Sequence, residues 1–340
     1  MKQNGFNYTC KNSKNQNLLV SVVVVSRNAK NTIKRCLDNI LNQTYPNIEI
    51  VVVDSSDDET KEILEEYKNK SKFPFKIIHQ EPKGVGAARN AGILNANGEI
   101  ITGADVDVFI PKDFVEKIAE PFNKLDKVMG VLAKDLIKSS SNSLFSDLVC
   151  LYENLMLKEI PVYNTPDIGI KSFRKKFINK IGGFDEELKS GEDAPFWNKV
   201  AKVKKELEDQ GYLFPVVDTI TIEEKQGQSF KEYWKRCIWY GKPLANLKYL
   251  KNNLKVNISK IVGAAYITML PFAAFAMLAY SFALWQILLL FAPIIGLLFY
   301  IMYKATLKKV MTWKLILIPV VLYYKSFWTF VGFVIGILGR

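Results

Sequence analysis

The feature of this sequence that most constrains its fold is an uncharged stretch of 43 residues, Ile261 to Tyr303. A transmembrane helix needs about 20 apolar residues to cross about 30 Å of hydrocarbon, so this stretch is long enough for two. Tyr280 and Trp285 lie near its middle, where a turn would bring both aromatic rings to the headgroup region. The stretch therefore predicts a transmembrane hairpin with spans at about 261–281 and 284–303.

The placement of charge predicts how this hairpin is oriented. The formal net charge is +12, and thirteen Lys or Arg follow Glu232, the last acidic residue. Lys260 precedes the hairpin and Lys304 follows it, whereas its central turn carries no charge. Loops rich in Lys and Arg stay in the cytoplasm. We therefore expect a multi-pass protein of the cell membrane, with residues 1–260 and the 304–314 loop on the cytoplasmic side.

Two further segments flank the hairpin. Residues 229–257 interleave aromatic and basic side chains, a composition typical of an amphipathic helix that contacts membrane lipids. Residues 315–338 are apolar except for Lys325. This composition slightly favours a third span whose lysine faces protein or reaches the headgroups, and a helix lying in the interface stays open. A basic segment also suits nucleic acid, but beside apolar spans no nucleic-acid partner is expected.

The chain before the hairpin alternates apolar runs with amphipathic segments. The runs "LLVSVVVV" from Leu18 and "IEIVVVD" up to Asp54 predict buried strands, and residues 33–41 between them have a helical apolar period. Such alternation predicts an α/β domain with a mostly parallel sheet covered on both faces. The predicted domains are a polar tail 1–17, an α/β domain 18–228, a juxtamembrane segment 229–257 and an α-helical membrane domain 258–340.

Two aspartates, Asp105 and Asp107, follow an apolar strand in "ITGADVD". Side chains two residues apart on an extended segment share a face, and two close carboxylates repel unless a cation neutralises them. Mg²⁺ or Mn²⁺ prefers such oxygen ligands, although a polar turn would explain the pair as well. Asp54 also ends a strand, and ligands of open α/β sheets bind at the carboxyl ends of strands.

Two more motifs carry charged residues. In "EPKGVGAARNAG" the glycines allow a close loop before a helix, so Lys83 and Arg89 could face a diphosphate or simply be solvated cations. In "SGEDAPFW" Glu192 and Asp193 suit the first turn of a helix, where carboxylates are favoured by the dipole. His79 is the only histidine of the chain, so a base that acts on a hydroxyl would have to be a carboxylate.

The order of these pieces resembles a family 2 glycosyltransferase with the GT-A fold over roughly residues 18–245. The matching pieces are "VSVVVVSRN" from Val20, Asp54, "GVGAARNAG", "GEIITGADVD", "GGFDE" and "GED". The resemblance implies that Asp54 contacts the nucleotide base or ribose of a nucleotide-diphosphate sugar. It also implies that Asp105 and Asp107 hold Mn²⁺ or Mg²⁺ against the diphosphate, and that Asp193 takes the proton from an acceptor hydroxyl, with inversion. Lys83, Arg89 and Glu192 are expected to be further contacts to the donor.

The Gln-x-x-Arg-Trp signature of processive synthases is missing, since Arg236 and Trp239 have the wrong spacing. We therefore expect a membrane-anchored, hexosyltransferase-type enzyme that transfers one sugar to a lipid-linked glycan. A polyprenyl-phosphate sugar synthase and a non-catalytic membrane protein that binds sugar nucleotides stay open as alternatives. Oligomerisation stays open as well.

Overall fold

The computed structural model describes the whole chain except residues 1, 4–5, 8–16, 107, 140–142, 157–170, 189–191, 226–229, 247–253, 280–283, 308–309, 311 and 339–340. The chain folds into two compact units. The α/β unit comprises Met1–Ile137 and Val162–Glu224, and the helical unit comprises Lys138–Pro161 and Lys225–Arg340. Asp107, one of the two aspartates expected to bind metal, lies outside the described residues, so its role stays a prediction.

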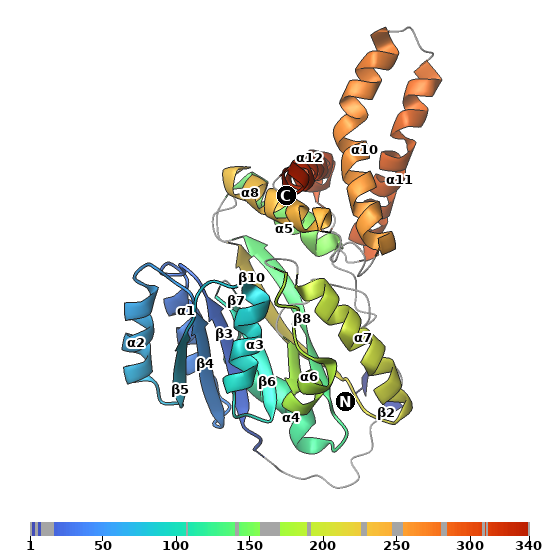
Figure 1. Ribbon diagram of the computed structural model, residues 1–340. Helices are drawn as coiled ribbons and strands as arrows, with labels where there is room; N and C mark the ends of the chain where they lie inside the picture. Colours follow the sequence, from blue (N-terminus) through green and yellow to red (C-terminus); the bar gives the residue numbers. More distant parts are fainter. Residues whose placement is uncertain are drawn as a thin grey trace. The chain divides into compact units, whose positions relative to one another are not determined.

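The α/β unit is built on an eight-stranded mixed sheet of strand order β5-β4-β3-β6-β9-β8-β10-β7 (Figure 1). The strands are β3 (Val20–Ser26), β4 (Ile48–Asp54), β5 (Phe75–His79), β6 (Ile100–Asp105), β7 (Val108–Phe109), β8 (Gly130–Ser139), β9 (Lys171–Arg174) and β10 (Val216–Lys225). Strands β5, β4, β3 and β6 are parallel neighbours. Strand β9 is antiparallel to β6 and β8, and β10 is antiparallel to β7. A separate antiparallel pair joins β1 (Lys2–Gln3) and β2 (Phe6–Asn7).

Helices cover both faces of this sheet. They are α1 (Ile33–Leu41), α2 (Thr60–Lys70), α3 (Val85–Asn95), α4 (Phe114–Lys124), α6 (Lys175–Ile181) and α7 (Asp193–Asp209). Val22 and Val24 of β3 pack in one apolar core with α1, α2 and α4, whereas Val23 packs in a second core with α3, α6 and α7. Alternate residues of a strand point to opposite faces, so a strand buried on both sides is apolar throughout. The mostly parallel, two-sided α/β prediction is confirmed.

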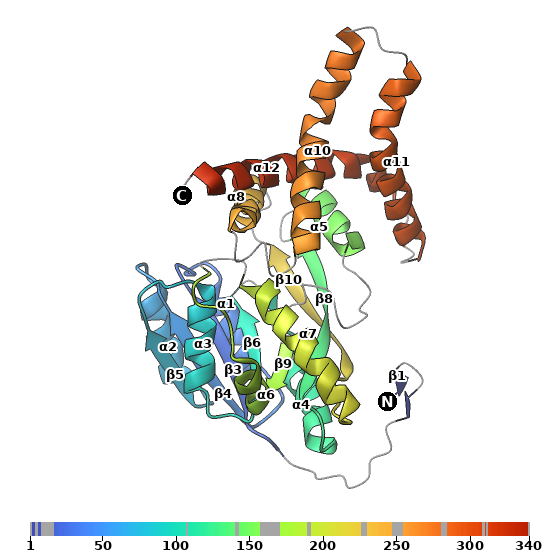
Figure 2. The same ribbon diagram turned by 45° about the vertical axis from the view of Figure 1, so that its right-hand side comes forward.

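The helical unit contains the C-terminal apolar helices. Its elements are α5 (Leu144–Met156), α8 (Phe230–Gly241), η1 (Lys242–Ala245), α10 (Leu254–Ala279), α11 (Leu284–Leu307), η2 (Trp313–Leu317) and α12 (Ile318–Leu338). Figures 1 and 2 show α10 and α11 side by side as a hairpin, and the Tyr266 hydroxyl donates to the Leu290 carbonyl between them. By length and composition, Asn257–Met277 and Trp313–Leu338 are each able to cross a membrane.

Helix α5 packs with the C-terminal helices although it lies between β8 and β9 in the sequence. Phe145 and Val149 of α5 share an apolar core with Tyr233 of α8 and with Ile318 and Val321 of α12. Nothing in the sequence indicated this packing, because α5 carries no motif and its partners lie far along the chain. The domain limits drawn from the sequence stay a prediction.

Candidate active site

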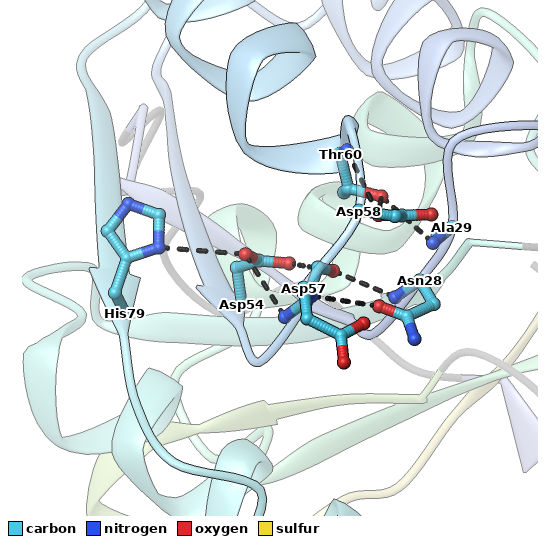
Figure 3. Close-up of polar contacts among 8 residues, drawn as sticks. Asn28, Ala29, Asp54, Asp57, Asp58, Thr60 and His79 are labelled. Atoms are coloured by element: carbon cyan, nitrogen blue, oxygen red, sulfur yellow. Dashed lines mark hydrogen bonds and ion pairs between the residues drawn. The ribbon is translucent and has the colours of Figure 1, made fainter.

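The first part of the site lies where β3, β4 and β5 end. Asp54 closes β4, and strand pairing places it between Ser26 of β3 and His79 of β5. Only 1% of Asp54 is exposed. Its carboxylate accepts hydrogen bonds from the Ser56 hydroxyl at 2.6 Å and from the Ser56 amide at 3.3 Å, and lies 3.5 Å from Nδ1 of His79 (Figure 3). These partners offset the cost of burying a carboxylate.

The loops after β3 and β4 are joined by side chain to backbone hydrogen bonds (Figure 3). The Asn28 amide donates to the Ser56 hydroxyl at 2.8 Å, and the Asp57 amide donates to the Asn28 side chain at 3.0 Å. Asn28 has φ of 51°, a left-handed conformation that asparagine tolerates better than most residues. Thr60 similarly holds the Ala29 amide. Sequence reasoning missed Asn28 and Ser56, although an Asn in a loop that follows a buried strand is a known turn signal.

The second part of the site gathers three motifs around one arginine. Nη1 of Arg89, on α3, lies 2.5 Å from Oε1 of Glu192 and 2.7 Å from Oδ1 of Asp193. Its Nη2 lies 3.5 Å from Oδ1 of Asp105, at the end of β6. Lys83 is exposed in the loop before α3 and, in the described part of the chain, makes no ion pair with these residues. The structure therefore brings together Arg89, Asp105, Glu192 and Asp193, which were expected in one site, but not Lys83.

Helix α3 also contacts the glycine-rich segment around Phe184, which precedes Glu192 and Asp193 in the sequence. The Asn90 side chain accepts a hydrogen bond from the Phe184 amide at 2.9 Å and donates to the Phe184 carbonyl at 3.0 Å. Gly183 has φ of 61°, and a Cβ there would lie 2.6 Å from Oδ1 of Asn90. A Cβ at Gly86 would lie 2.9 Å from a backbone oxygen of the same segment. The two glycine-rich motifs are therefore in direct contact, which positions Arg89 against Glu192.

Among the four described side chains of this cluster, negative charge exceeds positive charge. One guanidinium and three carboxylates give a formal charge of −2. Only 3% of Glu192 is exposed, and burial, followed by the charge of Asp193, raises the pKa of Glu192 despite its contact with Arg89. Burial lowers the pKa of Arg89, but the charges of Asp105, Asp193 and Glu192 together outweigh it and hold that pKa above its usual value. One arginine shared among three carboxylates cannot neutralise all of them.

Parts of the cluster remain available to a ligand. The Asp105 and Asp193 side chains are 46% and 45% exposed. Oε2 of Glu192 is buried and has no hydrogen-bond partner among the described residues. Those residues, which exclude Asp107, contain no group of three or more His, Cys, Asp or Glu side chains placed to hold a metal ion. A metal at Asp105 would therefore have to complete its shell with Asp107, water or donor oxygens.

Comparison with known proteins identifies the family. The family model described as "Glycosyl transferase family 2" matches residues 21–182. The putative glycosyltransferase EpsH of Bacillus subtilis is 29% identical over 245 residues, which is 72% of this chain and 62% of EpsH. The match thus reaches less than two thirds of EpsH. An uncharacterized glycosyltransferase of Rickettsia typhi is 30% identical over 257 residues, which is 73% of this chain and 76% of that protein.

Among solved structures, the mannosyltransferase PcManGT of Pyrobaculum calidifontis, in complex with GDP-Man and Mn²⁺, has a similar fold. Its TM-score is 0.58 at 19% identity, over 93% of this chain and 87% of that chain. A likeness at this identity concerns the fold alone. It shows that the α/β unit has the predicted GT-A fold, and the family model and the Rickettsia relative establish that the chain belongs to glycosyltransferase family 2.

Proposed function

We propose that this protein is a membrane-anchored inverting glycosyltransferase that transfers one sugar from a nucleotide-diphosphate sugar to a hydroxyl of a lipid-linked glycan. The observation that carries the proposal is the convergence of Asp105, Arg89, Glu192 and Asp193 at one end of the sheet. A strand end with a Gly-rich helix start beside it suits a diphosphate. A partly exposed carboxylate beside it suits the activation of a hydroxyl.

In this proposal Asp193 is the general base. The acceptor oxygen attacks the anomeric carbon, the bond from that carbon to the diphosphate breaks, and the acceptor proton passes to Asp193. The Asp193 carboxylate is half exposed, so an acceptor hydroxyl can reach it, and its bond to Arg89 fixes its direction. Glu192 is too deeply buried for this task and instead orients Arg89 beside the donor.

The residues present fit a divalent cation. A formal charge of −2 beside a partly exposed Asp105 favours Mg²⁺ or Mn²⁺, and PcManGT holds Mn²⁺ together with its donor. We propose that Asp105 and Asp107 hold the ion, which when bound would stabilise negative charge on the departing diphosphate. Arg89 is already beside Asp105 and would contact the same phosphate oxygens. We also propose that Lys83, which is exposed in the loop before α3, contacts that diphosphate.

The nucleoside is proposed to lie beside the ends of β3 and β4. Because the Asp54 side chain is fully buried, its main contribution there is to hold the Ser56 loop. A direct contact of Asp54 with the base or ribose stays a prediction. The carboxylate is already paired with Ser56 and His79, so it is oriented before the donor binds.

The proposed anchor is the hairpin of α10 and α11, which crosses the cell membrane and leaves the α/β unit in the cytoplasm. Both helices are longer than the roughly 20 residues that a span requires. Lys304, near the end of α11, and the basic residues before α10 support this orientation through the positive-inside rule.

The test is transfer of radiolabelled sugar from UDP-, GDP- and other nucleotide sugars into membrane lipid, with Mn²⁺ or with a chelator. Asp193→Asn should abolish metal-dependent transfer to a hydroxyl while donor binding stays within about two- to threefold of wild type. Asp209→Asn, at the other end of α7, is the matched control and should transfer normally. Equal transfer by Asp193→Asn and wild type would refute the assignment of the base.

The same experiment separates the alternatives. A lipid phosphate is already ionised near neutral pH and needs no base. Label in an acid-labile lipid monophosphate that persists in Asp193→Asn would therefore indicate a polyprenyl-phosphate sugar synthase. Donor binding by wild type without any transfer would indicate a non-catalytic sugar-nucleotide-binding protein.

A further inference from the structure

We infer that α12 does not cross the membrane but lies in its cytoplasmic interface, with one face against α5 and α8 and the opposite face shared between α10 and the lipid. The inference rests on the membrane anchoring contained in the proposed function. By length and composition alone α12 is able to span. Its contacts inside the helical unit decide against that role.

The first contacts are with α5, which holds the N-terminal half of α12. Nζ of Lys314, just before α12, lies 2.6 Å from Oδ2 of Asp147. Nζ of Lys325, in the middle of α12, lies 3.9 Å from Oε1 of Glu153 and 5.1 Å from the ring centroid of Tyr152. The single charge within the apolar stretch 315–338 therefore faces a protein partner. Both ends of α5 continue into strands of the sheet, β8 before it and β9 after it, and its 13 residues are too few to cross a bilayer. Helix α5 therefore lies on the same side of the membrane as these strands.

The second contacts are with α8, which follows α12 along its length. The Tyr324 hydroxyl donates to the Phe230 carbonyl at 2.6 Å, and the rings of Trp328 and Trp234 lie 4.8 Å apart. Further along α12, a Cβ at Gly332 would overlap the backbone of α8 at Ile238. Near the end of α12, a Cβ at Gly336 would lie 2.8 Å from the Lys242 carbonyl. Helix α12 thus remains in contact with α8 and η1 over about 12 residues, or about 18 Å.

These partners are too polar to enter the hydrocarbon. Lys231 and Lys235 of α8 and Lys242 of η1 are exposed. If α12 stood across the membrane, α8 and η1 would accompany it through much of the bilayer. The exposed lysines at the start of α8 and in η1 would then face lipid tails, which is strongly unfavourable. If α12 lies flat, the same lysines reach the anionic headgroups instead, where they are favourable.

The remaining surface of α12 suits lipid. Its exposed large apolar residues are Val320, Tyr323, Ile335, Ile337 and Leu338, preceded by Ile316 of η2. At 100° per residue the α12 positions lie on one side of the helix, opposite the buried Ile318, Val321 and Gly332. Figure 2 shows α12 lying crosswise to α10 and α11, and Figure 1 shows it nearly end-on. With the hairpin upright in the bilayer, this apolar side of α12 would be buried at the headgroup boundary.

A topology measurement on the full chain tests the inference without any substitution. Reporters that distinguish cytoplasm from exterior are fused after Arg340 and, as references, after Lys309 and after Ser281, which lies between α10 and α11 in the sequence. The fusion after Arg340 should match Lys309 and differ from Ser281. A match with Ser281 would show that α12 crosses and would overturn the inference. If the two references match each other, the proposed hairpin itself is wrong and the inference falls with it.

Depth measurements give a second, independent readout. Nitroxide labels at Val320→Cys and Ile335→Cys are compared in vesicles of phosphatidylethanolamine and phosphatidylglycerol, with the unmodified protein as a labelling blank. Fifteen helical residues separate these sites, so a spanning helix would place them about 22 Å apart in depth. We expect depths within about 5 Å of each other, whereas Val262→Cys and Phe275→Cys on α10 should differ by up to about 20 Å. A depth difference on α12 as large as that on α10 would refute the inference.

Discussion

Replacing Arg89 by methionine tests the electrostatic account of the site. Arg89 is the only cation in contact with Asp105, Glu192 and Asp193 among the described residues, so Arg89→Met changes the formal charge of the cluster from −2 to −3. Asp105 and Asp193 are half exposed and water screens them. Glu192 is buried and would lose the partner of its Oε1 oxygen. The main consequence therefore concerns Glu192.

The expected loss of stability has an upper limit, because Glu192 can take up a proton instead of staying ionised. With an unfolded-state pKa of 4.5, holding this carboxyl neutral at pH 7.0 costs about 2.5 units at about 1.36 kcal/mol each, or about 3.4 kcal/mol. At pH 5.5 the same limit is about 1.4 kcal/mol. The folded-state pKa of Glu192 lies above its unfolded value, so the folded state binds more protons and loses stability as pH rises from about 4.5 through the folded-state pKa.

The assay is thermal unfolding of the full chain in detergent, followed by tryptophan fluorescence at pH 7.0 and pH 5.5. At about 2–4 °C per kcal/mol, Arg89→Met should lower Tm by up to about 7–14 °C at pH 7.0 and by up to about 3–6 °C at pH 5.5. Lys83→Met, which removes an exposed cation from the neighbouring loop, should change Tm by less than about 2 °C. Arg89→Met combined with Glu192→Gln should recover much of the loss. Equal losses at both pH values, or no recovery in the double variant, would refute the reasoning.

Three further outcomes follow from the α/β unit. Gly86→Ala forces a Cβ to within 2.9 Å of a backbone oxygen, so it should cost about 1–3 kcal/mol of stability in denaturant unfolding, whereas Gly103→Ala, with open space around it, should cost less than about 1 kcal/mol. Asp105→Asn should raise the Mn²⁺ concentration for half-maximal transfer by at least about tenfold, and an unchanged requirement would exclude Asp105 as a ligand. The Glu49 carboxylate accepts hydrogen bonds from the Ser21 hydroxyl, from Asn97 and from the Gly98 amide. Burial raises the pKa of Glu49, but these bonds together outweigh burial and lower that pKa. Wild type should therefore lose stability relative to Glu49→Gln as pH falls below about 4.5, and parallel pH profiles would contradict this.

The sequence was sufficient for the local elements and for the family. The unbroken valine run of β3 and the apolar period of α1 depend on neighbouring residues, and the structure confirms both. The apolar helices were likewise predictable, because a stretch of 43 uncharged residues has few possible structures besides apolar helices. The order of the motifs identified the glycosyltransferase family before any contact between them was known. Such features depend on residue type and short-range spacing, which a sequence states directly.

Contacts between distant residues were decided only by the tertiary structure. Arg89 and Glu192 are separated by 103 residues. No local sequence pattern predicts that the guanidinium of Arg89, on α3, contacts the carboxylate of Glu192, next to the start of α7. The ion pair of Lys325 with Glu153 also joins residues that are far apart in the sequence. It attaches α12 to α5, although the composition of α12 is that of a membrane-spanning helix. The sequence alone determined the first parallel strands, the apolar C-terminal helices and the residues that can do chemistry. Which of these residues contact each other was decided by the tertiary structure. The physical reason is that a buried charge is costly unless it is paired, and only the packing of distant segments supplies its partner.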